Sequence, residues 1–175
     1  MKVLFALLLS LGLCGVAQAD AGFSLSGRIS IRQQETAYHG TLSWQHSVAQ
    51  DDLVLAGPFG QSMAELYRDE HGAVLSLPDG AQVRAETLDA LAGRLFGTPI
   101  PIAALPDWLR GIAPDATKDK SGRPARLVVP EWIVEWLRYG DNGKPQLILI
   151  ESSDSTVSVR LRVDSWEELV AEGEK

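Results

Sequence analysis

The chain opens with two long segments in which apolar and polar residues alternate, residues 23–32 and 38–46. Alternate side chains lie on the same face of a strand, so this pattern predicts two half-buried β-strands. Their apolar faces carry Leu25, Ile29, Leu42 and Trp44. Gly27 and Gly40 interrupt these faces, where a sheet bends sharply or another backbone approaches closely. The first part of the fold is therefore predicted to be a curved antiparallel sheet.

Shorter segments of the same type follow, separated by turn sequences. The predicted strands are residues 53–56, 63–68, 73–77, 81–85, 126–129, 132–139, 146–151 and 157–163. The turn Gly57-Pro58-Phe59-Gly60 places Phe59 at the tip of a tight, rigid hairpin, and Pro78-Asp79-Gly80 is a second turn. Residues 115–124 are expected to form a polar loop, and residues 167–175 a frayed helical turn. About ten strands at such intervals predict an antiparallel sheet or barrel.

Helical spacing of apolar residues occurs over residues 87–112. Leu88, Leu91 and Leu95 share one stripe of a helix that Thr87 can cap. A second, short helix has an apolar face made of Ile102, Leu105, Leu109 and Ile112, flanked by Trp108. The fold class is thus mainly β with α (α+β), with two helices available to cover one face of the sheet.

The first 19 residues have the features of a signal peptide. Lys2 precedes an apolar core, and Ala17-Gln18-Ala19 has the small-x-small pattern of a cleavage site. Two processing routes remain open. Cleavage after Ala19 leaves one domain, residues 20–175, in the periplasm, whereas lipidation of Cys14 removes residues 1–13 and anchors the chain to a membrane. Leu13 departs from the lipoprotein pattern, which has a small residue at this position.

Composition narrows the function classes. The hydrophobic fraction of 45% and the charged fraction of 22% are those of a folded globular protein. The formal net charge of -7 opposes nucleic-acid binding and suggests no polybasic route to anionic lipid. No membrane-spanning segment is predicted, because the apolar core of the signal peptide is too short.

Catalytic and metal sites are not predicted. His39 and His46 lie seven positions apart on one predicted strand, so their side chains point to opposite faces and cannot share a metal ion. His71 and the acidic pair Asp51-Asp52 are expected in solvated turns or loops. No nucleophile elbow, phosphate-binding loop or zinc spacing appears. The expectation is a binding protein without catalytic residues, metal or cofactor.

The apolar inventory allows two interpretations. Sheet and helices could simply form a filled core, which makes the chain a structural envelope protein. Five tryptophans and proline-broken links between the helices favour instead an interior that the helices do not fill. Such an interior is a cavity for a hydrophobic ligand.

Several motifs, taken in order, resemble one known family. They are Ser26-Gly27-Arg28-Ile29; Tyr38, Gly40, Leu42 and Trp44; Gly57-Pro58-Phe59-Gly60 with Glu65-Leu66; Gly97-Thr98-Pro99-Ile100-Pro101 with Leu105, Trp108-Leu109 and Gly111; and the strand 132–139. Over residues 23–166 their order and spacing are similar to the LolB family. These proteins are receptors in the outer membrane of Gram-negative bacteria, which accept lipoproteins from the periplasmic carrier LolA and place them in that membrane.

The resemblance implies an unclosed antiparallel β-barrel with a helical lid, and acyl chains bound between sheet and lid. The implied cavity residues are Leu25, Ile29, Leu42, Trp44, Leu66, Leu91, Leu95, Ile102, Leu105, Trp108, Leu109, Trp132, Val134, Trp136, Val159 and Leu161. It implies membrane insertion through Gly57, Pro58, Phe59 and Gly60. It further implies a monomer whose partners are a LolA-like carrier, acylated lipoproteins and outer-membrane lipid. A soluble carrier of the LolA type is the alternative.

Overall fold

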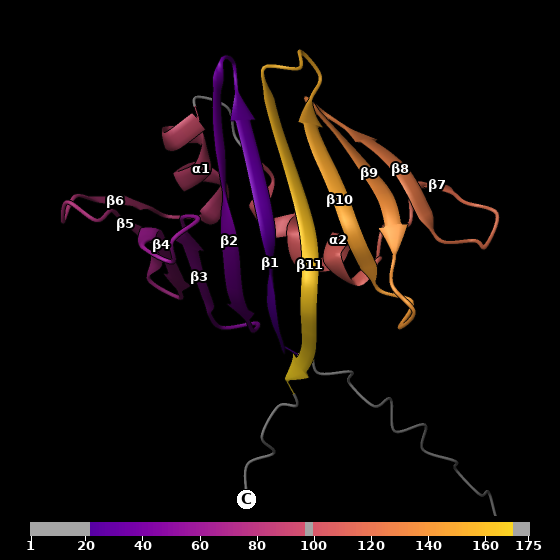
Figure 1. Cartoon of the computed structure of the whole chain (residues 1–175), viewed down its shortest axis with the longest axis horizontal. Helices are drawn as coiled ribbons and strands as arrows, with labels where there is room; N and C mark the ends of the chain where they lie inside the picture. Colours follow the sequence, from indigo (N-terminus) through magenta and orange to yellow (C-terminus); the bar gives the residue numbers. More distant parts are fainter. Residues whose placement is uncertain (1–21, 97–99, 170–175) are drawn as a thin grey trace, which may run out of the picture.

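One antiparallel sheet forms most of the molecule. The structure is a computed structural model that describes residues 22–96 and 100–169. Its strands are β1 (Gly22–Gln33), β2 (Thr36–His46), β3 (Asp51–Ala56), β4 (Ser62–Asp69), β5 (Gly72–Ser76), β6 (Gln82–Ala85), β7 (Thr117–Lys118), β8 (Pro124–Val129), β9 (Trp132–Tyr139), β10 (Pro145–Ser152) and β11 (Val157–Leu169). The order across the sheet is β6-β5-β4-β3-β2-β1-β11-β10-β9-β8-β7 (Figure 1). The first and last strands therefore meet in the middle, and β6 and β7 form the two edges.

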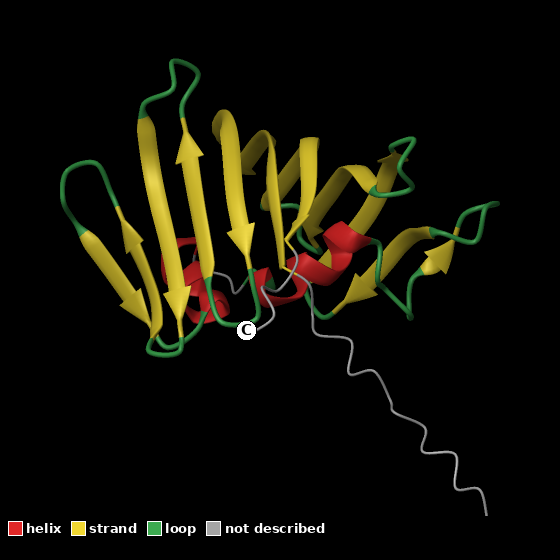
Figure 2. Cartoon of the chain, turned by 90° about the horizontal axis from the view of Figure 1, so that it is seen from below, coloured by secondary structure: helices red, strands yellow, loops and turns green. Residues whose placement is uncertain are grey.

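Three short helical segments lie on one face of this sheet. They are α1 (Leu88–Phe96), the 3-10 helix η1 (Ile102–Ala104) and α2 (Leu105–Arg110). Figure 2 shows the sheet curved around them, with its outer face free of helices. α1 contacts β5 and β6, and α2 contacts β10. The predicted class, mainly β with α in the form of an unclosed antiparallel barrel with a helical lid, is confirmed.

Local sequence signals explain the ends of the helices. The Thr87 hydroxyl accepts a hydrogen bond from the Ala90 N–H at 3.1 Å, which is the predicted N-cap. Gly111 ends α2 in a left-handed conformation with φ of 79°, and its N–H donates to the Trp108 carbonyl. The predicted place of Ile112 on the apolar face of this helix is therefore wrong. Ile112 follows the left-handed cap and is 53% exposed.

Three further expectations differ from the structure. The predicted polar loop 115–124 contains the short edge strand β7, which pairs with β8. Residues 167–169 continue β11 beside β1 instead of forming a helical turn, as the pairing of Leu169 with Gly22 shows. Asp51 begins β3 and is 2% exposed, so it does not lie in a solvated loop. Strand pairing decided the local conformation in each case: β7 pairs with the next strand β8, residues 167–169 pair with β1, and Asp51 pairs with His46 of β2.

The sheet bends where glycine was expected to allow it. The register of β1 against β11 shifts between Ser26 and Gly27, with Asp164 as the extra residue on β11. A Cβ atom at Gly27 would collide with the Arg162 carbonyl oxygen, and one at Gly40 with the Ala56 carbonyl oxygen. Another backbone therefore approaches closely at both positions, as the sequence predicted, and only glycine leaves room for it.

Candidate functional site

An apolar cavity lies between the inner face of the sheet and the helices. Its volume is about 140 Å³. The lining residues are Ile29, Ile31, Leu42, Trp44, Leu53, Leu55, Ala64, Leu66, Leu75, Ala92, Ile100, Ile102, Leu105, Leu109, Ile148, Ile150, Val159 and Leu161. Charged residues are absent from this set, so the cavity offers hydrocarbon contacts and little else.

Strand register places the cavity wall. Ile29 pairs with Leu161, which in turn pairs with Ile148, so three neighbouring strands present these side chains in one row. Ile31, Val159 and Ile150 form the next row in the same way. Rows of residues at alternate positions share a face, and β-branched and leucine side chains build a continuous apolar surface. The helices contribute Ala92 from α1, Ile102 from η1, and Leu105 and Leu109 from α2.

The cavity is small for a long acyl chain. An engineered cavity of about 150 Å³ in another protein stays dry and binds a ligand the size of benzene. The volume here, about 140 Å³, is comparable. The cavity as described therefore has room for a small apolar group and not for a whole fatty acyl chain.

The structure divides the predicted cavity residues into two groups. The lining of the cavity includes Ile29, Leu42, Trp44, Leu66, Ile102, Leu105, Leu109, Val159 and Leu161. A second group is buried in the core but lies outside the lining: Leu25, Leu91, Trp108, Trp132, Val134 and Trp136. The side chain of Leu95 lies outside the described residues.

Packing of α2 against β9 explains why Trp108, Trp132 and Trp136 lie outside the cavity lining. The Trp136 Nε1 donates a hydrogen bond to the Trp108 carbonyl at 2.9 Å, which ties β9 to α2. Trp132 and Val134 are 2% and 0% exposed in the same cluster. On the β9 side of the inner face α2 packs directly against the sheet. The empty space remains between the central strands, α1, η1 and the side chains of Leu105 and Leu109 of α2.

Other lining residues follow patterns that do not predict a place on the inner face. Ile148 and Ile150 belong to an unbroken apolar run, Leu147 to Ile150, which gives no alternation from which to choose a face. Leu53 and Leu55 lie on a short strand, where two residues are too few to establish a period. The pairing of β2 with β3 shows why Leu55 faces the cavity, because it lies opposite Leu42, which is on the predicted inner face.

A buried polar cluster holds one wall residue in place. The Asp51 Oδ1 accepts hydrogen bonds from Trp44 Nε1 at 2.9 Å and lies 2.6 Å from His46 Nδ1. The Asp51 Oδ2 accepts one from Arg68 Nε at 2.7 Å. Burial alone would raise the pKa of Asp51, but the hydrogen bonds from His46, Trp44 and Arg68 outweigh it and lower the pKa below its usual value. Asp51 is therefore a paired, ionised carboxylate in the interior.

The hairpin between β3 and β4 projects Phe59 into solvent. Phe59 is 95% exposed, so it is not a core residue folded back onto the sheet. The Gly57 N–H donates to the Gln61 carbonyl at 2.9 Å, and the Gly60 N–H donates to the Gly57 carbonyl at 2.9 Å. Gly60 has φ of 80°, which an L-residue rarely adopts. These constraints present the aromatic ring on a defined loop instead of a flexible one.

The described part of the chain also shows whether a metal site or a membrane-crossing helix is present. Within residues 22–96 and 100–169, no group of three or more His, Cys, Asp and Glu residues is placed to hold a metal ion. In the same ranges, no helix is long and apolar enough to cross a membrane. Cys14 lies outside the described residues.

The fold and the cavity together define an open antiparallel half-barrel whose inner face is covered by helices around an apolar space. The family model for the outer membrane lipoprotein LolB matches residues 21–166. The chain belongs to the LolB family. Membership places it in lipoprotein localisation at the outer membrane of the cell.

Individual relatives agree with this assignment. The outer-membrane lipoprotein LolB of Thiobacillus denitrificans is 32% identical over 158 residues, covering 87% of this chain and 83% of the relative. The protein of the same name from Azoarcus sp. is 33% identical over 155 residues, covering 86% and 80%. That of Dechloromonas aromatica is 29% identical and covers 96% of this chain and 99% of the relative.

A solved structure supports the fold alone. The crystal structure of a DUF1329 family protein from Desulfovibrio piger superposes with a TM-score of 0.52 at 9% identity, covering 91% of this chain and 89% of that one. The two chains therefore share an architecture.

Proposed function

We propose that this protein receives lipoproteins from a LolA-like carrier, holds their acyl chains in the cavity under the helices, and inserts them into the outer membrane. The observation that carries the proposal is the apolar cavity, because its wall of uncharged residues matches hydrocarbon and little else. The helices that cover it are short segments, and they are the wall elements that can move to admit a chain.

Transfer through this site is driven by differences in affinity. Each methylene left in water costs about 0.8 kcal/mol, so a chain of many methylenes stays in contact with an apolar environment throughout. A ligand moves an equilibrium only by as much as its affinities for the two states differ. The receptor therefore binds the acyl chains more tightly than the carrier does, and the bilayer binds them more tightly still.

Phe59 is proposed to be the residue that touches the membrane. Burying a Phe side chain contributes roughly 1.5 to 3 kcal/mol. That energy is enough for transient contact and too small for a stable anchor, which normally needs two membrane-binding signals. Gly57, Pro58 and Gly60 hold the ring outward, so the hairpin is proposed to deliver the cargo into the bilayer.

The test separates cargo binding from insertion. The variant Phe59→Glu is expected to accept a lipoprotein from the carrier at the wild-type level and to lose its transfer to vesicles. The matched control is Val128→Glu, because Val128 is 65% exposed on β8, away from the hairpin. Equal loss of uptake and transfer in Phe59→Glu, or equal loss of transfer in both variants, would contradict the proposal.

The N-terminus distinguishes a receptor from a carrier. We propose that Cys14 is lipidated and anchors the mature protein to the periplasmic side of the outer membrane. Mass spectrometry of the mature protein is expected to find an acylated Cys14 at the N-terminus. An unmodified N-terminus at Asp20 would instead favour the soluble carrier of the LolA type. We also propose that the mature domain is a monomer, which sedimentation of the soluble domain measures directly.

A further inference from the structure

The outer face of the sheet carries a basic groove, although the whole chain is acidic. The groove has a volume of about 550 Å³ on the side opposite the helices. Its ionisable lining residues are Arg28, His39, Arg138, Arg160 and Arg162. The net charge of -7 therefore hides a local concentration of positive charge. The expectation that the charge leaves no basic route to anionic lipid holds for the average composition and not for this face.

Strand register explains the concentration. Arg28 on β1 lies opposite Arg162 on β11, and Arg160 lies opposite Ser30, so the two strands in the middle of the sheet bring these arginines together. Their inward neighbours on the same strands line the cavity, so these polar positions face outward. Arg138 reaches this face through a register shift, since Trp136 lies opposite Ile148 whereas Arg138 lies opposite Leu147.

The arginines differ in how far they are already neutralised. Arg28 donates two hydrogen bonds of 3.0 Å to the Asp164 carboxylate, and Arg162 Nε lies 3.2 Å from the same group. Within residues 22–96 and 100–169, Arg138 and Arg160 have no ion pair. Glu151 on β10 faces the same side, opposite Ser158, and forms no ion pair with Arg160 within the described part of the chain. Arg138 and Arg160 are thus the two guanidinium groups available to an anion.

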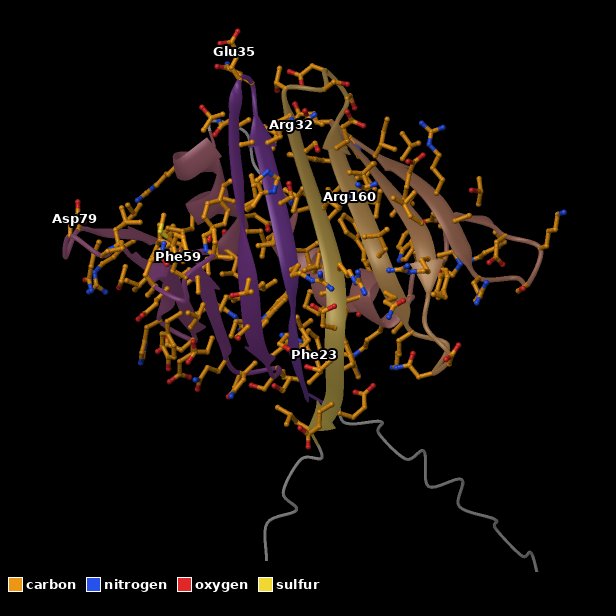
Figure 3. All side chains as sticks on the ribbon, viewed as in Figure 1. Phe23, Arg32, Glu35, Phe59, Asp79 and Arg160 are labelled. Carbon is orange, nitrogen blue, oxygen red and sulfur yellow. The ribbon has the colours of Figure 1, made fainter. Side chains whose placement is uncertain are left out.

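The groove is continuous with the hairpin that carries Phe59. Pro58 is one of its lining residues, together with Gly40 and Thr41 of β2. Figure 3 shows Arg160 near the middle of the outer face and Phe59 toward the β3–β4 side, with β1 and β2 between them. A membrane surface has a layer of headgroups above its hydrocarbon. An apolar side chain can enter the hydrocarbon while cations beside it contact the headgroups.

We propose that this groove binds the phosphate groups of anionic phospholipids when Phe59 enters the bilayer. The inference rests on the membrane contact proposed for Phe59. Guanidinium groups pair with phosphate oxygens through two parallel hydrogen bonds, and two of them are available here. The site would orient the protein on the membrane and add affinity for negatively charged leaflets, which the single aromatic ring does not supply.

The test measures binding of the domain of residues 20–175, without a lipid anchor, to vesicles of phosphatidylcholine with and without phosphatidylglycerol. The double variant Arg138→Gln/Arg160→Gln is expected to bind the anionic vesicles roughly 25-fold more weakly, about fivefold for each arginine near the surface. Binding to the neutral vesicles is expected to stay at the wild-type level. The anionic preference of the wild type is expected to fall as salt rises, because exposed charges are screened.

A matched control has the same change in net charge. Arg84 on the edge strand β6 and Lys120 in the hairpin between β7 and β8 are exposed and far from the groove in the sheet order. The variant Arg84→Gln/Lys120→Gln is expected to keep wild-type binding to both kinds of vesicle. Equal weakening by both double variants would show a general charge effect and overturn the site.

Two further results would overturn the proposal in different ways. If the arginine variant binds anionic vesicles as the wild type does, the groove does not recognise headgroups. If it instead loses uptake of lipoprotein from the carrier in the absence of vesicles, the groove docks an acidic protein surface. Phe59→Glu tests the proposed function separately, since its loss of binding is expected on neutral and anionic vesicles alike.

Discussion

Trp44 Nε1 donates a hydrogen bond to Asp51 Oδ1 at 2.9 Å, which joins a wall residue of the apolar cavity to a buried carboxylate. The two residues lie on neighbouring strands, and Asp51 also holds His46 and Arg68. An indole fixed at one end by a charged acceptor has little freedom to rotate into the cavity. The polar cluster thus keeps the space beside Trp44 open.

The first prediction concerns the stability that this cluster provides. Asp51→Ala leaves Arg68 and His46 without their buried acceptor, so it is expected to lower the free energy of unfolding by about 3 to 5 kcal/mol. Urea unfolding followed by tryptophan fluorescence measures the loss. The control is Asp164→Ala, which breaks an exposed ion pair with Arg28 and is expected to cost much less. Equal losses of unfolding free energy in the two variants would mean that the buried cluster stabilises the fold no more than an exposed ion pair does.

The second prediction is a dependence of stability on pH. The pKa of Asp51 is lower in the folded protein than in the unfolded chain, so the unfolded state binds more protons as pH falls. Its contribution is fully present above the unfolded pKa of about 4 and is lost as pH falls through the folded value. The stability difference between wild type and Asp51→Asn is therefore expected to shrink below about pH 4. Urea midpoints measured across that range test this, and a constant difference would contradict it.

Alternation in the sequence was enough to predict the strands and an antiparallel sheet or barrel, because it is a local property, whereas the unclosed barrel with a helical lid was implied by the resemblance to the family. β1 and β2 bury one side of each strand, and the spacing of Leu88 and Leu91 identifies α1. The composition of the cavity wall was less predictable, because it depends on where the helices sit. Trp136 and Trp44 both lie on the apolar face of an alternating strand. α2 covers Trp136, however, whereas Trp44 lines the cavity.

Two features had no local signal at all. Asp51 reads as a turn residue next to Asp52, and its burial depends on Arg68, which is distant in the sequence. The basic groove arises because β1 and β11, the first and last strands, pair in the centre of the sheet. Net charge cannot reveal such an arrangement, since it averages over faces that the fold separates.

The third prediction uses two buried alanines to test whether the cavity is available space. Ala92 on α1 lines the cavity and Ala73 on β5 lies in the filled core, and each is 1% exposed. Ala92→Leu is expected to cost less than about 1 kcal/mol of stability, because the added methylenes enter empty space, and to weaken binding of a fluorescent fatty acid. Ala73→Leu is expected to overpack the core at a cost of about 1 to 3 kcal/mol and to keep the affinity.

The prediction would be contradicted if Ala92→Leu lost as much stability as Ala73→Leu, or if Ala92→Leu bound the fatty acid as tightly as the wild type. An equal loss of stability would show that the space beside α1 is already filled in solution. Unchanged binding would place the acyl chain somewhere else on the protein. Thermal unfolding and a fluorescence titration on the same samples provide both readouts.

The last prediction concerns how tightly the helical cover is closed. The Asp89 carboxylate on α1 accepts a hydrogen bond from the Ala103 N–H of η1 at 3.0 Å, linking the two helices across the residues that join them. Asp89→Ala removes this link and is expected to lower stability by about 0.5 to 1.5 kcal/mol. Because the cover then opens more often, release of a bound fatty acid is expected to become several times faster in stopped-flow measurements. Asp89→Asn retains an acceptor oxygen and is expected to keep the release rate near that of the wild type. If both variants released ligand at the wild-type rate, opening of α1 away from η1 would not limit access to the cavity.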